Sequence, residues 1–286
     1  MIPGPSAILE GRGCKLDLSR PRVMAVLNVT PDSFSDGGDY PGVESAFRRG
    51  LTLIAEGADL IDIGGESSRP GADPVTESEE LDRVIPVITQ LRNETDIPLS
   101  IDTTKNVVAR EAVLAGVNYI NDISGLKFDP AMADVAAETG AGLFLMHTRG
   151  TPREMQKCTD YKDLLTEVIA YLQQSIDMAL AAGVSRQAIA VDPGIGFGKS
   201  IEGNLTLLRQ LSALHQLGFP VLLGTSRKSF IGQILNQGDP RQRLAGTLAT
   251  LALGVAKGVQ LFRVHDVQEA KDAVLVAWAI REGMLP

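Results

Sequence analysis

Polar side chains follow a series of short apolar segments along this chain. An Asn, Asp, Arg or His stands at or near the end of these segments. The residues are Asn28, Asp62, Asp102, Asn121, His147, Asp192, Arg263 and His265. Buried carboxylates are costly unless they are paired or accept hydrogen bonds, so a converging set requires a donor-rich ligand or a basic residue. A single Asp could be an ordinary helix N-cap, but the whole set at one end of a sheet indicates a binding site.

A second group of residues is suited to binding an anion. Residues 225–230 (TSRKSF) follow an apolar run and open a helical stretch, so backbone N–H groups and the positive end of the helix dipole would lie beside Lys228. An ordinary capped helix is the alternative interpretation. Arg263 and His265 stand just before another predicted helix, where phosphate commonly binds in barrel folds. Of the three histidines, His265 is therefore the best placed for function.

The glycine-rich segment 192–200 (DPGIGFGKS) is not a nucleotide-binding motif. A P-loop would require Gly at position 193, which is Pro, and a dinucleotide fingerprint would require Gly at 199, which is Lys. We interpret these glycines as allowing the backbone to approach a ligand held by Asp192. His147 and His215 are expected to be structural.

The elements that position these residues alternate between strand and helix. Strands are predicted over residues 24–27, 59–64, 99–102, 118–121, 142–147, 188–192, 220–224 and 260–265. Helices are predicted over 43–57, 77–92, 106–115, 130–139, 161–182, 201–217, 227–235, 241–257 and 267–281. No linker divides the chain, so residues 1–286 are predicted to form one α/β domain, a (β/α)8 TIM barrel. An open doubly wound sheet is the alternative, but it would use only one or two strands for chemistry.

Strand alternation selects the side chains that face the barrel interior. Residues two apart share a face of a strand. Asp102 and Asp192 should therefore point inward together with Asn121, while their apolar neighbours face the helices. The segment before residue 24 is predicted to be a short hairpin that closes the opposite end of the barrel.

Composition limits the possible partners and compartment. The chain has 286 residues, 44% of them hydrophobic, with a net charge of −8 and a pI near 5.0. A general nucleic-acid or anionic-membrane surface is not expected at this charge. Cys14 and Cys158 lie far apart without metal-ligand spacing, so neither a disulfide framework nor a zinc site is predicted. With no signal-peptide or membrane-spanning pattern, a cytoplasmic protein is expected.

Seven motifs resemble those of the dihydropteroate synthase family, in order and across nearly the whole chain. They are residues 28–38 (NVTPDSFSDGG), 64–72 (GGESSRPGA), 100–103 (SIDT), 121–125 (NDISG), 192–199 (DPGIGFGK), 226–229 (SRKS) and 263–266 (RVHD). One departure is Ser68, where the family usually has Thr; its hydroxyl is kept, so the role is expected to survive. The resemblance implies a transferase of folate biosynthesis on a (β/α)8 barrel that is usually a homodimer.

The resemblance also implies a reaction and the residues that bind the pterin. The family joins 6-hydroxymethyl-7,8-dihydropterin diphosphate to 4-aminobenzoate, with loss of diphosphate, by a dissociative mechanism. It assigns Asp192 and Asn121 to the amino-pyrimidine edge and Asp102 to the neighbouring ring nitrogens. Lys228 would donate to the ring carbonyl, and Arg263 would lie over the ring and reach the diphosphate. No nucleophile–base constellation is visible, as suits such a mechanism.

The resemblance assigns the remaining site residues to the leaving group and the second substrate. Asn28, Ser68, Arg263 and His265 would hold the diphosphate, with Mg²⁺ bound through Asn28. Asp36, Ser68 and Arg69, together with the catalytic Lys228 and Arg263, would act as the first two loops close and exclude water. Phe34, Arg69, Pro70, Phe197 and Ser229 would bind 4-aminobenzoate and sulfonamide inhibitors.

Two other functions are alternatives to this reading of the sequence motifs. A folate-dependent methyltransferase shares the barrel and the pterin-edge carboxylate, but it would lack the first loop and the Ser226–Ser229 motif. A non-catalytic pterin-binding module would be favoured if Asn28, Lys228 or Arg263 were replaced, and all three are present.

Overall fold

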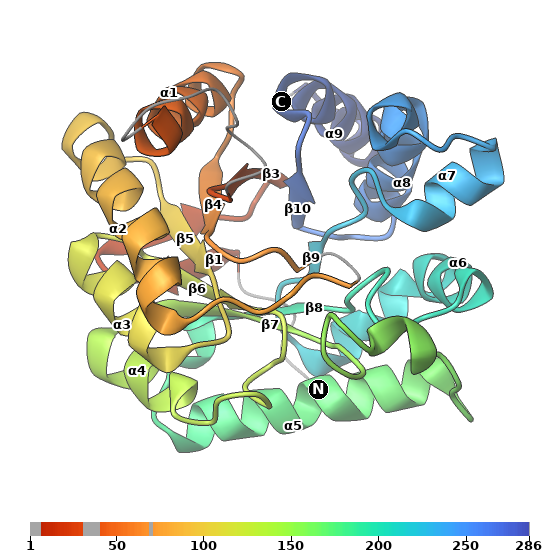
Figure 1. Ribbon diagram of the computed structural model, residues 1–286. Coiled ribbons are helices and arrows are strands. Elements are labelled where there is room, and N and C mark those ends of the chain that lie inside the picture. Colours follow the sequence, from red (N-terminus) through yellow and green to blue (C-terminus); the bar gives the residue numbers. More distant parts are fainter. Residues whose placement is uncertain (1–6, 31–40, 69–70, 286) are drawn as a thin grey trace.

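Eight parallel strands form a closed barrel in the computed structural model, which describes residues 7–30, 41–68 and 71–285 (Figure 1). The strands are β3 (Arg22–Asn28), β4 (Leu60–Gly64), β5 (Leu99–Asp102), β6 (Tyr119–Asp122), β7 (Gly142–Met146), β8 (Ile189–Asp192), β9 (Leu222–Leu223) and β10 (Leu261–Val264). Their order in the sheet is β8-β7-β6-β5-β4-β3-β10-β9. A parallel bridge between Val191 and Val221 joins β8 to β9. The predicted barrel is therefore confirmed.

Helices surround the barrel (Figure 1). They are α1 (Pro41–Ala55), α2 (Glu77–Glu94), α3 (Asn106–Ala115), α4 (Met132–Thr139), α5 (Leu164–Ala181), α6 (Ile201–Arg209), α7 (Ser229–Leu235), α8 (Leu244–Ala256) and α9 (Val267–Glu282). Side-chain hydrogen bonds to the backbone determine where several of these helices begin. Thr76 and Glu79 make a reciprocal capping box at the start of α2, and Ser200 caps α6 by accepting from the Gly203 N–H.

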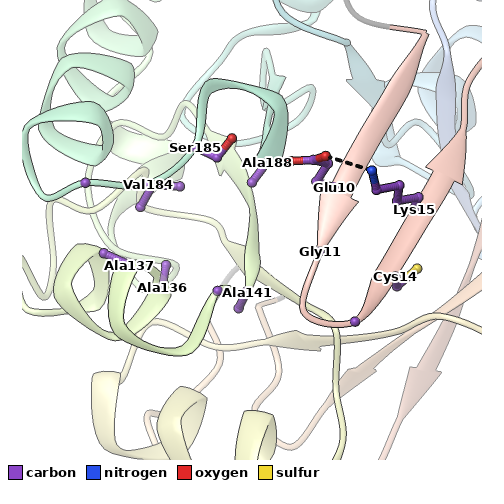
Figure 2. Close-up of a pocket in the computed structure, with 13 residues that line it drawn as sticks. Glu10, Gly11, Cys14, Lys15, Ala136, Ala137, Ala141, Val184, Ser185 and Ala188 are labelled. Atoms are coloured by element: carbon purple, nitrogen blue, oxygen red, sulfur yellow. Dashed lines mark ion pairs between the residues drawn. The ribbon is translucent and has the colours of Figure 1, made fainter.

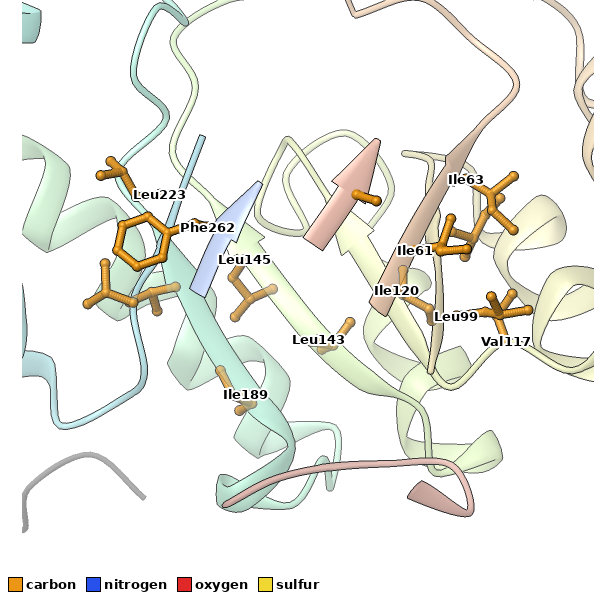
Figure 3. Packing of buried hydrophobic residues seen from close by; sticks show 14 of the residues in the cluster. Ile61, Ile63, Leu99, Val117, Ile120, Leu143, Leu145, Ile189, Leu223 and Phe262 are labelled. Carbon is orange, nitrogen blue, oxygen red and sulfur yellow. The ribbon is translucent and has the colours of Figure 1, made fainter. Parts of the chain in front are cut away.

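Alternation along the strands separates an apolar outer layer from a mixed interior. The outward side chains, among them Ile61, Leu99, Ile120, Leu143 and Phe262, are fully buried against the helices (Figure 3). Burial of this continuous layer is the main driving force for closing the barrel. The inward positions are then free to carry polar groups at one end.

A hairpin closes the bottom of the barrel, as predicted. Strands β1 (Ile8–Gly11) and β2 (Cys14–Asp17) pair in antiparallel register, with Leu9 opposite Leu16. Both leucines pack on the lowest inward layer, which includes Tyr119 and Phe144. The Tyr119 hydroxyl also donates to the Leu9 carbonyl at 3.0 Å. This end is thus filled with apolar side chains and leaves the opposite end for chemistry.

The structure corrects the bounds of several predicted helices: those expected from residues 161 and 241 begin at Leu164 and Leu244. The helix expected over residues 201–217 ends at Arg209 and is followed by a 3-10 helix, Leu211–Leu217. Because a 3-10 helix has three residues per turn, Leu211, Leu214 and Leu217 fall on one face, and all three are buried. The helix expected from residue 227 begins only at Ser229. In the described parts of the chain, no helix is long and apolar enough to cross a membrane.

Candidate active site

The inward polar residues converge at the carboxyl ends of the strands. Asn28, Gly64 and Asp102 are register partners on β3, β4 and β5, so they lie side by side. Gly64 has no side chain, and a Cβ built there would lie 3.5 Å from the Asp102 Cβ and 3.9 Å from the Asn28 Oδ1. This glycine leaves space between the two polar side chains, which is where a ligand can enter the mouth.

Arg263 connects two carboxylates across the mouth. Its Nε donates to Asp62 Oδ2 at 2.6 Å, and its Nη2 donates to Asp102 Oδ2 at 2.7 Å. Asn121 Nδ2 donates to the same Asp62 oxygen at 2.8 Å. The Asn121 amide is therefore oriented with its nitrogen toward Asp62, which leaves its oxygen to accept from a ligand.

Asp102 and Asp192 are buried acceptors with raised pKa values. Burial raises the pKa of Asp102 to about 7, and the charge of Arg263 only partly offsets it. Burial also raises the pKa of Asp192 to about 6, against the lowering effect of a 2.6 Å hydrogen bond from the Gly194 N–H. A ligand with two adjacent N–H donors would compensate these carboxylates, because charge-assisted hydrogen bonds to them are strong.

Lys228 lies on the anion-binding side of the mouth. Its Nζ is 4.0 Å from the centre of the Phe197 ring, a cation–π contact. Burial lowers the pKa of Lys228 to about 8, and the charge of Arg263 adds to the effect. The amine is thus still mostly protonated at neutral pH, and its burial strengthens the attraction between the ammonium group and an anion in the mouth.

Ser226 and His265 form a pair that sequence reasoning did not foresee. The Ser226 Oγ accepts the backbone N–H of His265 at 3.2 Å and lies 3.0 Å from its Nδ1. Burial and the charge of Arg263 lower the pKa of His265 to about 3. So weak a base cannot activate the serine at neutral pH. When Ser226 donates its proton to Nδ1, the neutral ring carries its own proton on Nε2, and this N–H is then able to donate to an anion.

Buried Lys199 holds the loop that follows Asp192. Its Nζ donates to the carbonyls of Gly194 and Phe197, both at 2.8 Å, and lies 2.9 Å from His147 Nδ1. The His147 backbone N–H in turn donates to the Asp192 carbonyl at 2.9 Å. His147 is therefore structural, as expected, and the contacts of Lys199 fix the backbone that carries Asp192 and Phe197.

Pockets occur at both ends of the barrel. A cavity of about 270 Å³ at the mouth is lined by Asp102, Ser68, Ile123 and loop residues from β4, β5 and β7. A larger pocket of about 510 Å³ lies between the hairpin and the loops after α4 and α5, beside the 3.3 Å ion pair of Glu10 and Lys15 (Figure 2). The pocket at the hairpin end contains none of the predicted site residues, so the chemistry belongs to the mouth.

Comparison with known proteins identifies the family. A model of pterin binding enzymes matches residues 24–265. A dihydropteroate synthase of Synechocystis sp. is 51% identical over 261 residues, which cover 91% of this chain and 90% of that protein. The chain belongs to the dihydropteroate synthase family. Its motifs predicted this membership, and the prediction that the chain is a transferase of folate biosynthesis is confirmed.

Solved structures of the dihydropteroate synthase family share the fold. The Xanthomonas albilineans enzyme with 4-aminobenzoic acid superposes with a TM-score of 0.91 at 46% identity, covering 96% of this chain and 98% of that one. The Yersinia pestis enzyme with a sulfonamide drug gives a TM-score of 0.90 at 46% identity, covering 96% and 99%. Both structures therefore match this barrel over nearly its full length.

Most of the predicted dihydropteroate synthase residues lie together in the mouth. Asp102, Asn121, Asp192 and Arg263 point inward, and Lys228 and His265 follow the adjacent strands β9 and β10. Ser68 lines the mouth cavity, while Ser229 is exposed at the first position of α7. Four predicted residues, Phe34, Asp36, Arg69 and Pro70, lie outside the described residues.

Two site residues were missed by sequence reasoning. Asp62 stands at the end of a predicted strand and the sequence motifs assign it no role, yet it bonds to both Arg263 and Asn121. The alternation that selected Asp102 also places Asp62 on the inner face, two residues before Gly64. In the sequence, Lys199 only excludes a dinucleotide fingerprint and carries no signal of its own role. Its burial depends on loop geometry, which no local pattern of the sequence reveals.

The Mg²⁺ ion that the motif resemblance implies would fit only a site with few protein ligands. Among the residues described by the structure, no cluster of three or more His, Cys, Asp or Glu side chains could hold a metal ion. Asn28 offers an amide oxygen at the rim of the mouth, beside the space left by Gly64. Magnesium accepts such an arrangement because it keeps several waters and often shares substrate phosphate oxygens.

Proposed function

We propose that this chain condenses 6-hydroxymethyl-7,8-dihydropterin diphosphate with 4-aminobenzoate to give 7,8-dihydropteroate and diphosphate. The observation that carries the proposal is the division of the mouth into two sides. Asp192, Asp102 and Asn121 supply acceptors, while Lys228 and the His265 loop supply donors for an anion. A pterin diphosphate has the matching polarity, with N–H donors at one end and phosphate oxygens at the other.

Pterin recognition rests on three oriented acceptors. Asp192 has one oxygen engaged by the Gly194 N–H, and its other oxygen accepts from the amino-pyrimidine edge. The oxygen of Asn121 accepts a second pterin donor because Asp62 fixes its nitrogen. Asp102 accepts from the neighbouring ring nitrogens. Buried charge-assisted contacts of this kind discriminate strongly against rings that lack the donors.

The diphosphate is bound by cations and a neutral imidazole. Lys228 and Arg263 supply positive charge, and the Nε2 proton of His265 donates to a phosphate oxygen. Ser68 lies at the edge of the mouth cavity, where its hydroxyl can reach the same group. Asn28 would hold Mg²⁺ through its amide oxygen, and the bound ion would offset the charge that develops on the leaving group.

The reaction is dissociative and needs no protein nucleophile. The bond between the pterin methylene and the diphosphate oxygen breaks, and the electron pair leaves with the diphosphate. The pterin ring delocalises the positive charge, and the amine nitrogen of 4-aminobenzoate then attacks the methylene and loses a proton. Lys228 and Arg263 stabilise the departing charge, which is the main contribution that fixed donors make to such a step.

The second substrate binds between Phe197 and the start of α7. Phe197 supplies an aromatic face, and Ser229 supplies a hydroxyl and a backbone N–H to the carboxylate. Phe34, Arg69 and Pro70 complete this site, and Asp36 acts with Ser68 and Arg69 as the loops exclude water. The Yersinia pestis relative binds a sulfonamide drug, which supports the same pocket as a sulfonamide site here.

The protein is proposed to be a homodimer in the cytoplasm. Exposed apolar side chains occur on three helices that pack in succession, α7, α8 and α9, where Ile234, Leu253, Val276 and Ile280 are 57%, 58%, 60% and 78% exposed. Apolar residues grouped on packed helices favour an interface between copies. Both cysteines, Cys14 and Cys158, are free thiols, which is consistent with a reducing compartment.

The proposed reaction is tested by measuring diphosphate release. We expect release from the pterin diphosphate when both 4-aminobenzoate and Mg²⁺ are present, together with formation of dihydropteroate. Omitting 4-aminobenzoate should stop product formation, and excess chelator should stop diphosphate release while the pterin without its diphosphate still binds. Full turnover in excess chelator would disprove the proposed roles of Mg²⁺ and Asn28, but the proposed condensation reaction would still stand.

A further inference from the structure

Arg227 adopts a backbone conformation that is unusual for its residue type. Its φ is +59°, in the left-handed region that glycine normally occupies. It is the third residue of a turn closed by the Lys228 N–H to Thr225 carbonyl bond, a position that usually takes Gly when φ is positive. Strain of this kind persists only where surrounding contacts enforce it, and it occurs often at functional sites.

Four hydrogen bonds enforce the conformation of Arg227. Its N–H donates to Thr247 Oγ1 at 3.1 Å, and its carbonyl accepts from Arg243 Nη1 at 2.9 Å. Its guanidinium forms a bidentate ion pair with Asp266, called the fork below. Nε lies 3.0 Å from Oδ2, and Nη2 is bonded to Oδ1. Both members of this ion pair are largely buried, with 30% and 21% of their side-chain surface exposed.

The fork connects the two loops that carry the anion-binding groups. Arg227 lies between Ser226 and Lys228 in the loop after β9, and Asp266 follows His265 in the loop after β10. Ser226 bonds to His265 alongside the fork. The β9–β10 ladder itself has only two residue pairs, so these side-chain links supply much of the connection between the loops at this end.

We propose that Arg227 is a positioning residue that holds Lys228 and His265 in the geometry required by the diphosphate. This inference rests on the proposed function of these two residues. The fork fixes the distance between the loops, and the left-handed backbone turns the Lys228 side chain back toward Phe197 inside the mouth. Arg227 itself acts through its neighbours, because its guanidinium is occupied by Asp266.

The test uses variants that remove the fork without adding backbone strain. Asn tolerates positive φ, so Arg227→Asn keeps the turn and loses the ion pair. We expect kcat/KM for the pterin diphosphate to fall by about 10²-fold, since small misplacement of catalytic groups costs this much. Binding of 6-hydroxymethyl-pterin, which has no diphosphate, should fall by clearly less than kcat/KM, at most about tenfold, because Asp192 and Asn121 stay in place and only the contact of Lys228 to the ring carbonyl is disturbed.

Two further variants provide the control and a second route to the same answer. Arg241 forms a similar ion pair with Asp239, but its side chain is 80% exposed. Arg241→Asn breaks this exposed pair and should leave kcat/KM unchanged. Asp266→Asn removes the other half of the buried fork. The double variant with Arg227→Asn should be no worse than the poorer single variant, because both changes break one interaction.

The outcomes separate this inference from the proposed function. If Arg227→Asn and Asp266→Asn both keep wild-type kcat/KM while the wild-type enzyme condenses its substrates, the positioning role is overturned and the reaction stands. An equal loss of pterin binding and turnover would also overturn it, because that pattern indicates general damage. Partial recovery in Arg227→Lys, which restores charge but not the fork, supports it.

Discussion

Asp62 shows how a residue that need not touch substrate can organise an active site. One of its oxygens accepts hydrogen bonds from both Arg263 and Asn121, and its side chain is fully buried on β4. Its other oxygen, Oδ1, has no hydrogen-bond partner among the described residues. A buried carboxylate is tolerated here because Arg263 neutralises it, and in return it fixes the directions of a cation and an amide.

Pterin affinity should depend on Asp192 more than on any other acceptor. Asp192→Ala removes the carboxylate that accepts from the amino-pyrimidine edge, so we expect a loss of about 2–5 kcal/mol in binding free energy. Isothermal titration with 6-hydroxymethyl-pterin measures this loss. Asp192→Asn is the matched control for size, and it should also bind poorly because its NH₂ group opposes a donor. Near-wild-type affinity in Asp192→Ala would disprove the assignment.

Pterin binding should also weaken in acid. Burial raises the pKa of Asp192 to about 6 and that of Asp102 to about 7 in the free protein. Only the ionised carboxylates accept the pterin donors, so affinity should fall by about tenfold per pH unit below the pKa of Asp102, and more steeply once Asp192 is protonated as well. Pterin-binding titrations at pH values across this range test whether the affinity falls in acid. Asp192→Asn should lack the step near pH 6.

At the scale of secondary structure, the strands were the most predictable elements. All eight were located from short apolar runs, because β-strands buried in a barrel must be apolar on their outer faces. The inward set of Asp102, Asn121 and Asp192 followed from alternation with period two. Helix α3, Asn106–Ala115, matches its predicted limits because Gly116 ends it with a φ of +123°.

Other features depend on contacts that the sequence does not display. The 3-10 helix Leu211–Leu217 forms because its three leucines, each three residues after the last, all pack on the core. If α6 continued as an α-helix, it would not bury these three side chains equally well. The late start of α7 results from the left-handed turn at Arg227, which bonds to Thr247, Arg243 and Asp266 far along the chain. Tertiary contacts here override local propensity.

The hairpin should contribute to stability without affecting catalysis. Leu9 is fully buried against the lowest barrel layer, so Leu9→Ala should lower the free energy of unfolding by about 2–5 kcal/mol through lost burial and a cavity. Denaturant titration measures this change. Ile8→Ala is the control, since Ile8 is 43% exposed. The KM for the pterin diphosphate should be unchanged in both, and a large rise in KM would contradict the separation of the two ends.

At the scale of the whole molecule, the helices on one side of the barrel are expected to form the dimer. Leu253 on α8 is 58% exposed, so Leu253→Glu should place a charge in the interface and yield monomers in analytical ultracentrifugation. Leu114→Glu is the matched control, because Leu114 is 61% exposed on α3, on a different side of the barrel (Figure 1). Dissociation by both variants, or by neither, would argue against this interface.

The position of β10 in the barrel has a consequence for how the protein is made. This strand is the last of the eight along the chain, yet it inserts between β3 and β9 and brings Arg263 to Asp62 and Asp102, 201 and 161 residues earlier. Until β10 emerges from the ribosome, those carboxylates have no counter-charge from Arg263 and the cylinder has a gap. Closure of the barrel and the charge pairing of the catalytic mouth therefore both require the same final strand.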